Sequence, residues 1–233
     1  MENRDKPEKW SVRSYVLRAG RMSDAQRRSY ETLGSRFCIP FQNETIKPAL
    51  VFENNNPLVI EIGFGMGVAT AALAEANPQI NYLGLEVHRP GVGRLLWEIE
   101  QRKLQNIRIV EHDAVEVLQS MIEDRSVQGF HIFFPDPWPK KRHHKRRLIQ
   151  RPFTDTLAQK LEETGYLYMA TDWEEYGRWA LDVLFQTPHL KNPYGGFAPR
   201  QNWRPYTKFE QKGLRQERQI WELYVVKEEG YGK

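Results

Sequence analysis

From Leu58 onward, the hydrophobic positions fall into short apolar runs separated by amphipathic stretches. The runs have the length and composition of buried strands, and the stretches between them have the period of helices. The predicted strands cover 58–62, 82–86, 107–110, 130–134, 165–170 and 220–226, and the predicted helices cover 68–76, 93–103, 115–122, 153–161 and 174–185. Strands that alternate with helices indicate an α/β fold, a mostly parallel sheet with helices on both faces. Such folds bind their ligands beyond the carboxyl ends of the strands.

Two segments depart from this alternation. Residues 1–45 form a predicted basic arm, in which Ser23-Asp24-Ala25-Gln26 is typical of a capping box that opens a short helix reaching about Thr32. Residues 46–233 form the predicted folded domain. Within it, residues 188–213 are irregular and rich in Pro, Gly and Arg, so we interpret them as a functional loop.

Composition narrows the class of protein. A chain of 233 residues suggests one domain, and it contains no apolar run of the roughly 20 residues that a membrane helix needs. Its start lacks the apolar stretch of a secretory signal, and its one cysteine, Cys38, excludes an internal disulfide. We therefore expect a cytoplasmic protein with no membrane partner. No protein partner is required by these patterns, and a monomer is favoured, although the sequence does not determine the oligomeric state.

The positive charge is clustered. The net charge is +4, and six basic residues are concentrated in one short segment: Lys140, Lys141, Arg142, Lys145, Arg146 and Arg147. A second group of arginines lies in the N-terminal arm. Clusters of this kind favour a polyanionic partner such as RNA, and the alternative is a solvated surface run or a targeting patch.

A glycine-rich turn follows the first predicted strand. Gly63, Gly65 and Gly67 come directly before a predicted helix, where glycines let the backbone approach a cofactor closely. A dinucleotide fingerprint would place its third glycine one position later, at Val68. Glu61, beside the turn, would repel a pyrophosphate but suits a cationic amino-acid group. The turn is a weak signal alone, and the acid favours S-adenosyl-L-methionine as the cofactor.

Two further acids follow the next two predicted strands. Glu86 ends the second strand, where an acid can accept both hydroxyls of a cofactor ribose; the alternative is a surface glutamate. Asp113, followed by Ala114, ends the third strand and could accept from an adenine amine. Asp before a helix is equally typical of an N-cap.

The segment after the fourth predicted strand is the most informative. It reads Pro135-Asp136-Pro137-Trp138-Pro139 and leads into the basic run. The prolines hold the carboxylate rigidly, Trp138 offers a ring for stacking on a base, and the basic run offers phosphate contacts. The alternative is a Pro-rich turn with an ordinary aspartate.

These motifs, together with Thr207-Lys208-Phe209-Glu210, resemble those of the bacterial tRNA (guanine-N7-)-methyltransferases. The likeness runs from about Arg13 to Val226, and its most specific part is the proline-flanked Asp136 followed by Trp-Pro-Lys-Lys. It implies a Rossmann-like class I methyltransferase fold, with a seven-stranded sheet whose last strand is antiparallel. It also implies methyl transfer from S-adenosyl-L-methionine to N7 of the variable-loop guanine of tRNA (guanosine 46).

The resemblance also implies residue roles. Asp136 is the residue that the family treats as catalytic. Contacts to the cofactor fall on Glu61, Gly63, Gly65, Gly67, Glu86, Asp113, Ala114 and Asp136, and contacts to the substrate fall on Lys140, Asp172, Thr207, Lys208, Phe209 and Glu210. Lys141, Arg142, Lys145, Arg146 and Arg147 are expected to bind RNA. Asp172 is equally well placed to cap the helix that follows it.

Two rival functions remain open. A nicotinamide-dependent dehydrogenase is disfavoured by the glycine spacing, and a non-catalytic tRNA-binding protein is disfavoured by the intact set of acids. The histidines show no zinc-ligand spacing, so no metal site is expected.

Overall fold

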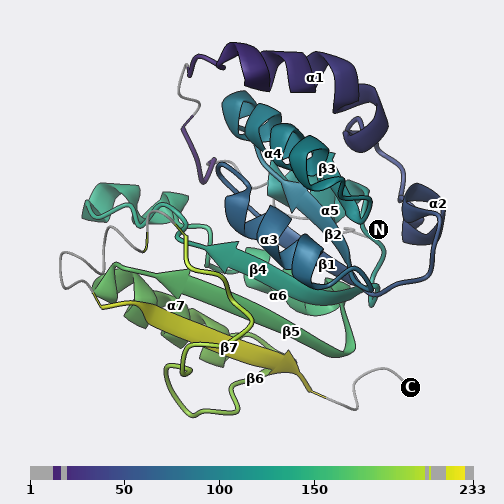
Figure 1. The fold of residues 1–233 in the computed structure, drawn as a ribbon. Helices are drawn as coiled ribbons and strands as arrows, with labels where there is room; N and C mark the ends of the chain where they lie inside the picture. The colour runs from purple at the N-terminus through teal and green to yellow at the C-terminus, as the bar shows by residue number, and fades with distance from the viewer. Residues whose placement is uncertain (1–12, 17–19, 208–209, 211–218, 229–233) are drawn as a thin grey trace, which may run out of the picture.

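Parallel strands form the centre of the sheet that carries the site (Figure 1). The computed structural model describes residues 13–16, 20–207, 210 and 219–228, and within them the chain forms one seven-stranded sheet of order β3-β2-β1-β4-β5-β7-β6. The strands are β1 (Leu58–Ile62), β2 (Asn81–Leu85), β3 (Ile107–Val110), β4 (Val127–Phe133), β5 (Leu161–Thr171), β6 (Leu190–Lys191) and β7 (Trp221–Lys227). Strands β1 to β5 pair in parallel, whereas β7 is antiparallel to both β5 and β6. The expected fold class is confirmed.

Helices cover both faces of the sheet. They are α1 (Asp24–Phe37), α2 (Pro48–Phe52), α3 (Val68–Ala76), α4 (Arg89–Arg102), α5 (Ala114–Ser120), α6 (Phe153–Lys160) and α7 (Glu174–Gln186), with a 3-10 helix η1 at Lys141–Arg146. α1, α3 and α4 lie on one face and α5, α6 and α7 on the other (Figure 1). Alternate residues of β1 enter the two cores: Val59 packs with α3 and α4, while Ile60 packs with α5, α6 and α7. This alternation follows from the pleat of a strand that is buried on both faces.

The structure confirms most of the predicted elements and extends several. The predicted ranges 58–62, 68–76 and 107–110 match β1, α3 and β3, while α2 and β6 were not predicted. α4 starts at Arg89, four residues before the predicted start at Gly93. Pro90 and Gly91 look like helix breakers in the sequence, but Pro fits the first turn of a helix, where its missing N–H has no acceptor in any case.

The N-terminal helix packs on the sheet domain. The predicted capping box is confirmed: the Gln26 amide donates to Ser23 Oγ at 3.3 Å, and the Ser23 amide donates to Gln26 Oε1 at 2.7 Å. The helix runs beyond the predicted end at Thr32 to Phe37, which is buried in the core beside α4. The division of the chain into an arm and a domain near residue 45 stays a prediction. Among the described residues, no helix is long and apolar enough to cross a bilayer.

Candidate active site

Five acidic side chains lie at one edge of the sheet, because the carboxyl ends of parallel strands meet there. They are Glu61 in β1, Glu86 after β2, Asp113 after β3, Asp136 after β4 and Asp172 after β5. β1 and β4 are neighbours in the centre of the sheet, and the chain order reverses between them. The sequence prediction therefore selected residues that the fold brings to one place.

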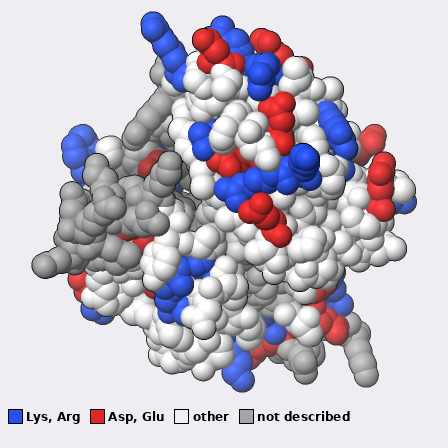
Figure 2. Space-filling view, viewed as in Figure 1, with Lys and Arg blue, Asp and Glu red and all other residues white. Residues whose placement is uncertain are grey.

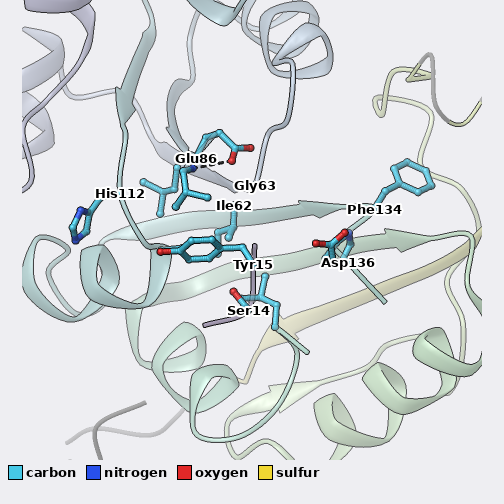
Figure 3. Close-up of a pocket in the computed structure, with 13 residues that line it drawn as sticks. Ser14, Tyr15, Ile62, Gly63, Glu86, His112, Phe134 and Asp136 are labelled. Atoms are coloured by element: carbon cyan, nitrogen blue, oxygen red, sulfur yellow. Dashed lines mark hydrogen bonds between the residues drawn. The ribbon is translucent and has the colours of Figure 1, made fainter. Parts of the chain in front are cut away.

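Two adjoining cavities occupy this edge. The first has a volume of about 240 Å³ and is lined by residues that include Tyr15, Glu86, His112 and Ala114. Figure 3 shows Glu86 and Asp136 on separate walls of it, with Tyr15 below Glu86, between His112 and Asp136. The second, of about 420 Å³, is lined by the glycine turn, Glu61, Asp172 and Thr207. Gly63 and Phe134–Asp136 line both cavities, so Asp136 faces two compartments that together suit a nucleoside and a second planar group.

The glycine turn leaves its backbone open to the cavities. Gly63, Gly65 and Gly67 have φ of 73°, 57° and 67°, a region that favours glycine. A Cβ on Gly63 or Gly65 would meet no atom of the described residues within 4 Å, so a ligand can lie directly against this backbone. Behind the turn, a Cβ on Gly91 would lie 2.0 Å from the Gly65 carbonyl oxygen. Helix α4 therefore packs against the turn with no side chain between them.

Glu61 is a buried acid with an unsatisfied oxygen. The residue is 2% exposed, and its Oε2 has no hydrogen-bond partner within the part of the chain that the structure describes. Burial raises the pKa of the Glu61 carboxyl to about 7, with the neighbouring Glu86 adding to the effect and the nearby Thr70 hydroxyl opposing it. A buried carboxylate without a partner favours a cation beside it. The second cavity, which Glu61 lines, is where such a cation would bind.

Glu86 ties the glycine turn to β2. Its Oε2 accepts from the Gly65 amide at 2.8 Å, and its Oε1 accepts from the amides of Val87 and His88 at 2.8 and 3.0 Å. Burial raises the pKa of the Glu86 carboxyl, and these backbone hydrogen bonds oppose the rise. Each carboxylate oxygen has further lone pairs, so Glu86 can still accept from a ligand hydroxyl.

Asp113 caps the helix that follows it. Its Oδ1 accepts from the Val115 amide at 2.8 Å at the start of α5, which confirms the N-cap interpretation. A contact with an adenine amine stays a prediction. The adjacent Ala114 lines the first cavity, where it is placed to contact a ring.

The segment that carries Asp136 is rigid and strained. Phe134 and Trp138, which flank it, have φ of 53° and 47°, conformations that cost about 1–3 kcal/mol each and are typical of functional sites. Trp138 Nε1 donates to the Ser14 carbonyl at 3.0 Å, and the Arg146 guanidinium lies 5.1 Å from its ring centre. One face of the predicted stacking ring is therefore already covered by a cation.

The residues of the basic run differ in exposure, and one of them is buried. Lys140, Lys141, Arg142 and Lys145 are exposed, and Arg146 is half-buried. Arg147 is fully buried: its guanidinium pairs with Glu175 and donates to the Pro137 carbonyl at 3.1 Å. The prediction that Arg147 contacts RNA phosphate is therefore wrong, because this side chain fastens the run to α7.

The two described residues of the Thr207–Glu210 segment have different surroundings. Thr207 lines the second cavity together with Asp172. Glu210 is 1% exposed, and its carboxylate pairs with Arg204. A contact between Glu210 and the substrate stays a prediction. Lys208 and Phe209 lie outside the described residues.

Sequence reasoning missed two contributors to the site. Tyr15 lines the first cavity and Arg204 holds Glu210. Tyr15 lies in the N-terminal arm and Arg204 in the irregular loop, and neither segment has a hydrophobic periodicity. Residue type was therefore the only feature of the sequence that could have pointed to either side chain.

Charge elsewhere on the molecule is mixed. Figure 2 shows basic and acidic side chains interspersed over α1 and α4. Arg28, from the arginine-rich arm, lies 3.6 Å from Glu100, and Arg102 pairs with Glu75 at 2.6 Å. Arg28 of α1 is therefore partly neutralised, whereas the exposed part of the Lys140–Arg147 run follows directly on the segment at Pro135–Pro137, which lines the second cavity.

Comparison with known proteins agrees with this geometry. A family model described as a putative methyltransferase matches residues 55–223. A tRNA (guanine-N(7)-)-methyltransferase of Nitrosospira multiformis is 50% identical over 94% of this chain and 96% of its own length. One of the same name from Dechloromonas aromatica is 50% identical over 94% of this chain and 89% of its own length.

Among solved structures, the 16S rRNA methyltransferase KamB is similar with a TM-score of 0.54 at 12% identity, over 93% of this chain and 98% of that one. A putative methyltransferase from Streptococcus mutans, solved in complex with SAH, has a TM-score of 0.51 at 10% identity, over 89% of this chain and 99% of that one. The fold and the strand-end site define a class I methyltransferase. Within that class, the chain belongs to the tRNA (guanine-N7-)-methyltransferase family.

Proposed function

We propose that this chain transfers a methyl group from S-adenosyl-L-methionine to N7 of the variable-loop guanine of tRNA. The observation that carries the proposal is the buried, unpartnered carboxylate oxygen of Glu61 beside an open glycine turn, with Asp136 on the wall shared by both cavities. Relatives that are half identical over nearly the whole chain carry the name of this activity. A substrate of this kind also fits the exposed basic run and a cytoplasmic location.

The residues present fit this cofactor. Glu61 would hold its ammonium group, Glu86 its ribose hydroxyls, and the first cavity, beside Ala114, its adenine. A pyrophosphate would be repelled by Glu61, which disfavours a nicotinamide cofactor at the same turn. When bound, S-adenosyl-L-methionine supplies an electrophilic methyl group on a positively charged sulfur.

The protein's task is mainly to position the base. Guanine N7 has an in-plane lone pair and no proton, so no general base is needed. A base held between Asp136, Asp172 and Thr207 in the second cavity would present N7 at about 3 Å from the methyl carbon, the distance that productive attack requires. Positive charge spreads onto the purine during the reaction, and nearby carboxylates stabilise it.

The decisive experiment uses a tRNA transcript and methyl-labelled S-adenosyl-L-methionine. Label is expected in 7-methylguanosine at the variable loop, and a transcript with adenine at that position should take up none. Binding of tRNA without transfer would favour a non-catalytic RNA-binding protein. Tight binding of NAD in calorimetry, without binding of S-adenosyl-L-methionine, would favour a dehydrogenase.

Replacing Glu86 by alanine is expected to weaken S-adenosyl-L-methionine binding by about 1.5–3 kcal/mol, the range for hydrogen bonds to a charged group. The substitution removes an acceptor for the ribose and also releases the Gly65 amide. Glu86→Gln keeps one acceptor oxygen and should lose less. Isothermal titration calorimetry measures both variants, and an unchanged affinity in Glu86→Ala would remove Glu86 from the cofactor site.

Neutralising the exposed part of the basic run should weaken binding to every tRNA by a similar factor. The variant replaces Lys141, Arg142 and Lys145 with glutamine and leaves the buried Arg147 intact. Each lost phosphate contact should reduce the slope of log K against log salt by roughly 0.7–0.9. Arg151→Gln, at a residue paired with Asp155 at 2.9 Å, is the control. An unaltered salt slope in the triple variant would identify the run as solvated surface.

A further inference from the structure

A buried arginine links the last long strand to the segment that carries Thr207. Arg204 Nη1 donates to Glu210 Oε2 at 2.7 Å, and Arg204 Nη2 donates to Glu210 Oε1 at 2.5 Å and to Glu222 Oε1 at 2.7 Å. Glu222 belongs to β7. All three side chains are sealed from solvent, with 0%, 1% and 4% of their surfaces exposed.

Such a network is a poor means of stabilising a fold. Removing three charged groups from water is costly, and well-packed apolar residues at the same positions are often as stable or more so. Here one guanidinium faces two carboxylates, and Arg204 Nε and Glu222 Oε2 have no hydrogen-bond partner among residues 13–16, 20–207, 210 and 219–228. The planar guanidinium group does, however, fix the orientation of its partners, because it binds a carboxylate through two parallel hydrogen bonds.

The network continues to the second cavity. The Glu210 amide donates to Thr207 Oγ1 at 3.0 Å, and the Thr207 amide donates to Glu210 Oε2 at 3.4 Å. The Thr207 hydroxyl accepts a hydrogen bond from the Glu210 amide, so its own hydrogen can still be donated to another group. Thr207 lines the cavity opposite the β1 and β4 ends, so that hydrogen is available to a base bound there.

The same guanidinium contacts the opposite wall. It lies 6.0 Å and 5.9 Å from the ring centres of Phe133 and Phe134, the two residues that precede Pro135 and Asp136. Arg204 thus touches the strand end that carries Asp136 while it holds, through Glu210, the segment that carries Thr207.

We propose that Arg204 is a positioning residue for methyl transfer, which sets the distance between Thr207 and Asp136 and thereby the orientation of the bound guanine. The inference rests on the proposed function and deepens it. Arg204 does not line either cavity, so it acts through Thr207 and through the Phe133–Asp136 segment.

The test compares Arg204→Met and Arg204→Lys with the wild type. In Arg204→Met, kcat/KM for tRNA should fall at least about 100-fold, mostly in kcat, because a base misplaced by about 1 Å reacts that much more slowly. The affinity for S-adenosyl-L-methionine should stay within about threefold of wild type, since Glu61 and Glu86 lie on β1 and after β2. Arg204→Lys keeps the positive charge but loses the planar guanidinium group, so kcat/KM for tRNA should fall about tenfold.

A second variant distinguishes a positioning role of Arg204 from a purely structural one, because it is designed to restore the stability of the fold without restoring the position of Thr207. The triple variant Arg204→Met/Glu210→Gln/Glu222→Gln removes every charge of the network, and its unfolding midpoint should recover while kcat stays low. Recovery of kcat together with stability would overturn the proposal. Lys160→Met is the control: this buried cation pairs with Asp124 at 2.7 Å at the opposite edge of the sheet, and its loss should lower stability with little change in kcat/KM.

Two further outcomes are decisive. If Arg204→Met does not fold, Arg204→Lys carries the test, and wild-type turnover in that variant would refute the role. If the wild type fails to methylate guanine in tRNA, the proposed function itself falls. If the wild type is active and Arg204→Met is equally active, the inference about Arg204 alone is wrong.

Discussion

Replacing Asp136 by alanine is expected to lower turnover on tRNA by at least about 100-fold, because the bound guanine loses the group that orients it. An ionised carboxylate only accepts hydrogen bonds, and N7 has no hydrogen to give. The donors of guanine are N1–H and the exocyclic N2 amine, on the edge away from N7. A carboxylate that holds this edge points N7 toward the methyl group. Asp136 is exposed on the wall shared by both cavities, where it can reach such an edge.

The direct measurement replaces the target guanine with inosine, which lacks the N2 amine. Inosine should react more slowly than guanine in the wild type. In Asp136→Ala the difference between the two bases should be much smaller, because this variant forms the hydrogen bond to the N2 position with neither base. Asp136→Asn, which keeps one acceptor oxygen, should retain more activity than the alanine variant. Adenine has neither donor at these positions, so this contact would also discriminate strongly against adenine.

The control is Asp182→Ala, which removes an exposed carboxylate from α7 and should leave turnover unchanged. Equal inosine penalties in the wild type and Asp136→Ala would show that Asp136 does not read the base. Its role would then have to be sought beside the sulfonium.

Replacing Glu61 by glutamine is expected to stabilise the cofactor-free protein at alkaline pH while it abolishes most cofactor binding. Burial raises the pKa of the folded-state carboxyl to about 7 from an ordinary value of 4.5. Between these values the folded state binds more protons than the unfolded state, so the contribution of Glu61 to stability falls as the pH rises from 4.5 through 7. At pH 8 the ionised carboxylate destabilises the fold by about 3 kcal/mol, a penalty that glutamine avoids.

Urea unfolding of the wild type and Glu61→Gln at pH 5 and pH 8 measures this effect. The stability difference should widen by about 2–3 kcal/mol in favour of glutamine at the higher pH. Glu163→Gln, at an exposed position of β5, should show no such widening. A constant difference across the range would mean that Glu61 is ionised throughout.

The same variant tests the cofactor site. Loss of a buried charge partner typically costs about 2–5 kcal/mol, so Glu61→Gln should bind S-adenosyl-L-methionine roughly 30- to 5,000-fold more weakly. Binding to the wild type should also release a proton near neutral pH, because the ammonium group favours the ionised carboxylate. Calorimetry in buffers of different ionisation enthalpy measures that proton. Unchanged affinity in a more stable variant would place the ammonium elsewhere.

The central elements of the fold could be predicted because their signals are local. β1 is apolar apart from one acid next to its last residue, and α3 follows a glycine turn, so composition alone places both. The start of α4 could not be predicted in this way, since the value of Gly91 lies in its contact with Gly65, which is distant in the sequence. β6 is too short to carry a period.

The residues of the site also fall into those with a local sequence signal and those that depend on contacts distant in the sequence. Acids at strand ends were predictable because parallel strands deliver their ends to one edge. The burial of Arg147 and Glu210 was not, because each depends on a partner from another element: Glu175 on α7 for Arg147, and for Glu210 an arginine that itself pairs with β7. In the sequence, both looked like ordinary charged residues beside a functional motif.

The contact between Gly91 and the glycine turn limits how this sequence can vary. Gly→Ala within a helix is ordinarily among the safest stabilising changes available to a protein engineer. At position 91 the added methyl group would lie 2.0 Å from a backbone oxygen, so α4 and the turn would have to separate. Any larger residue would separate them further and reshape the second cavity, which the glycine turn lines. We therefore expect position 91 to tolerate glycine alone, although Gly91 lines neither cavity.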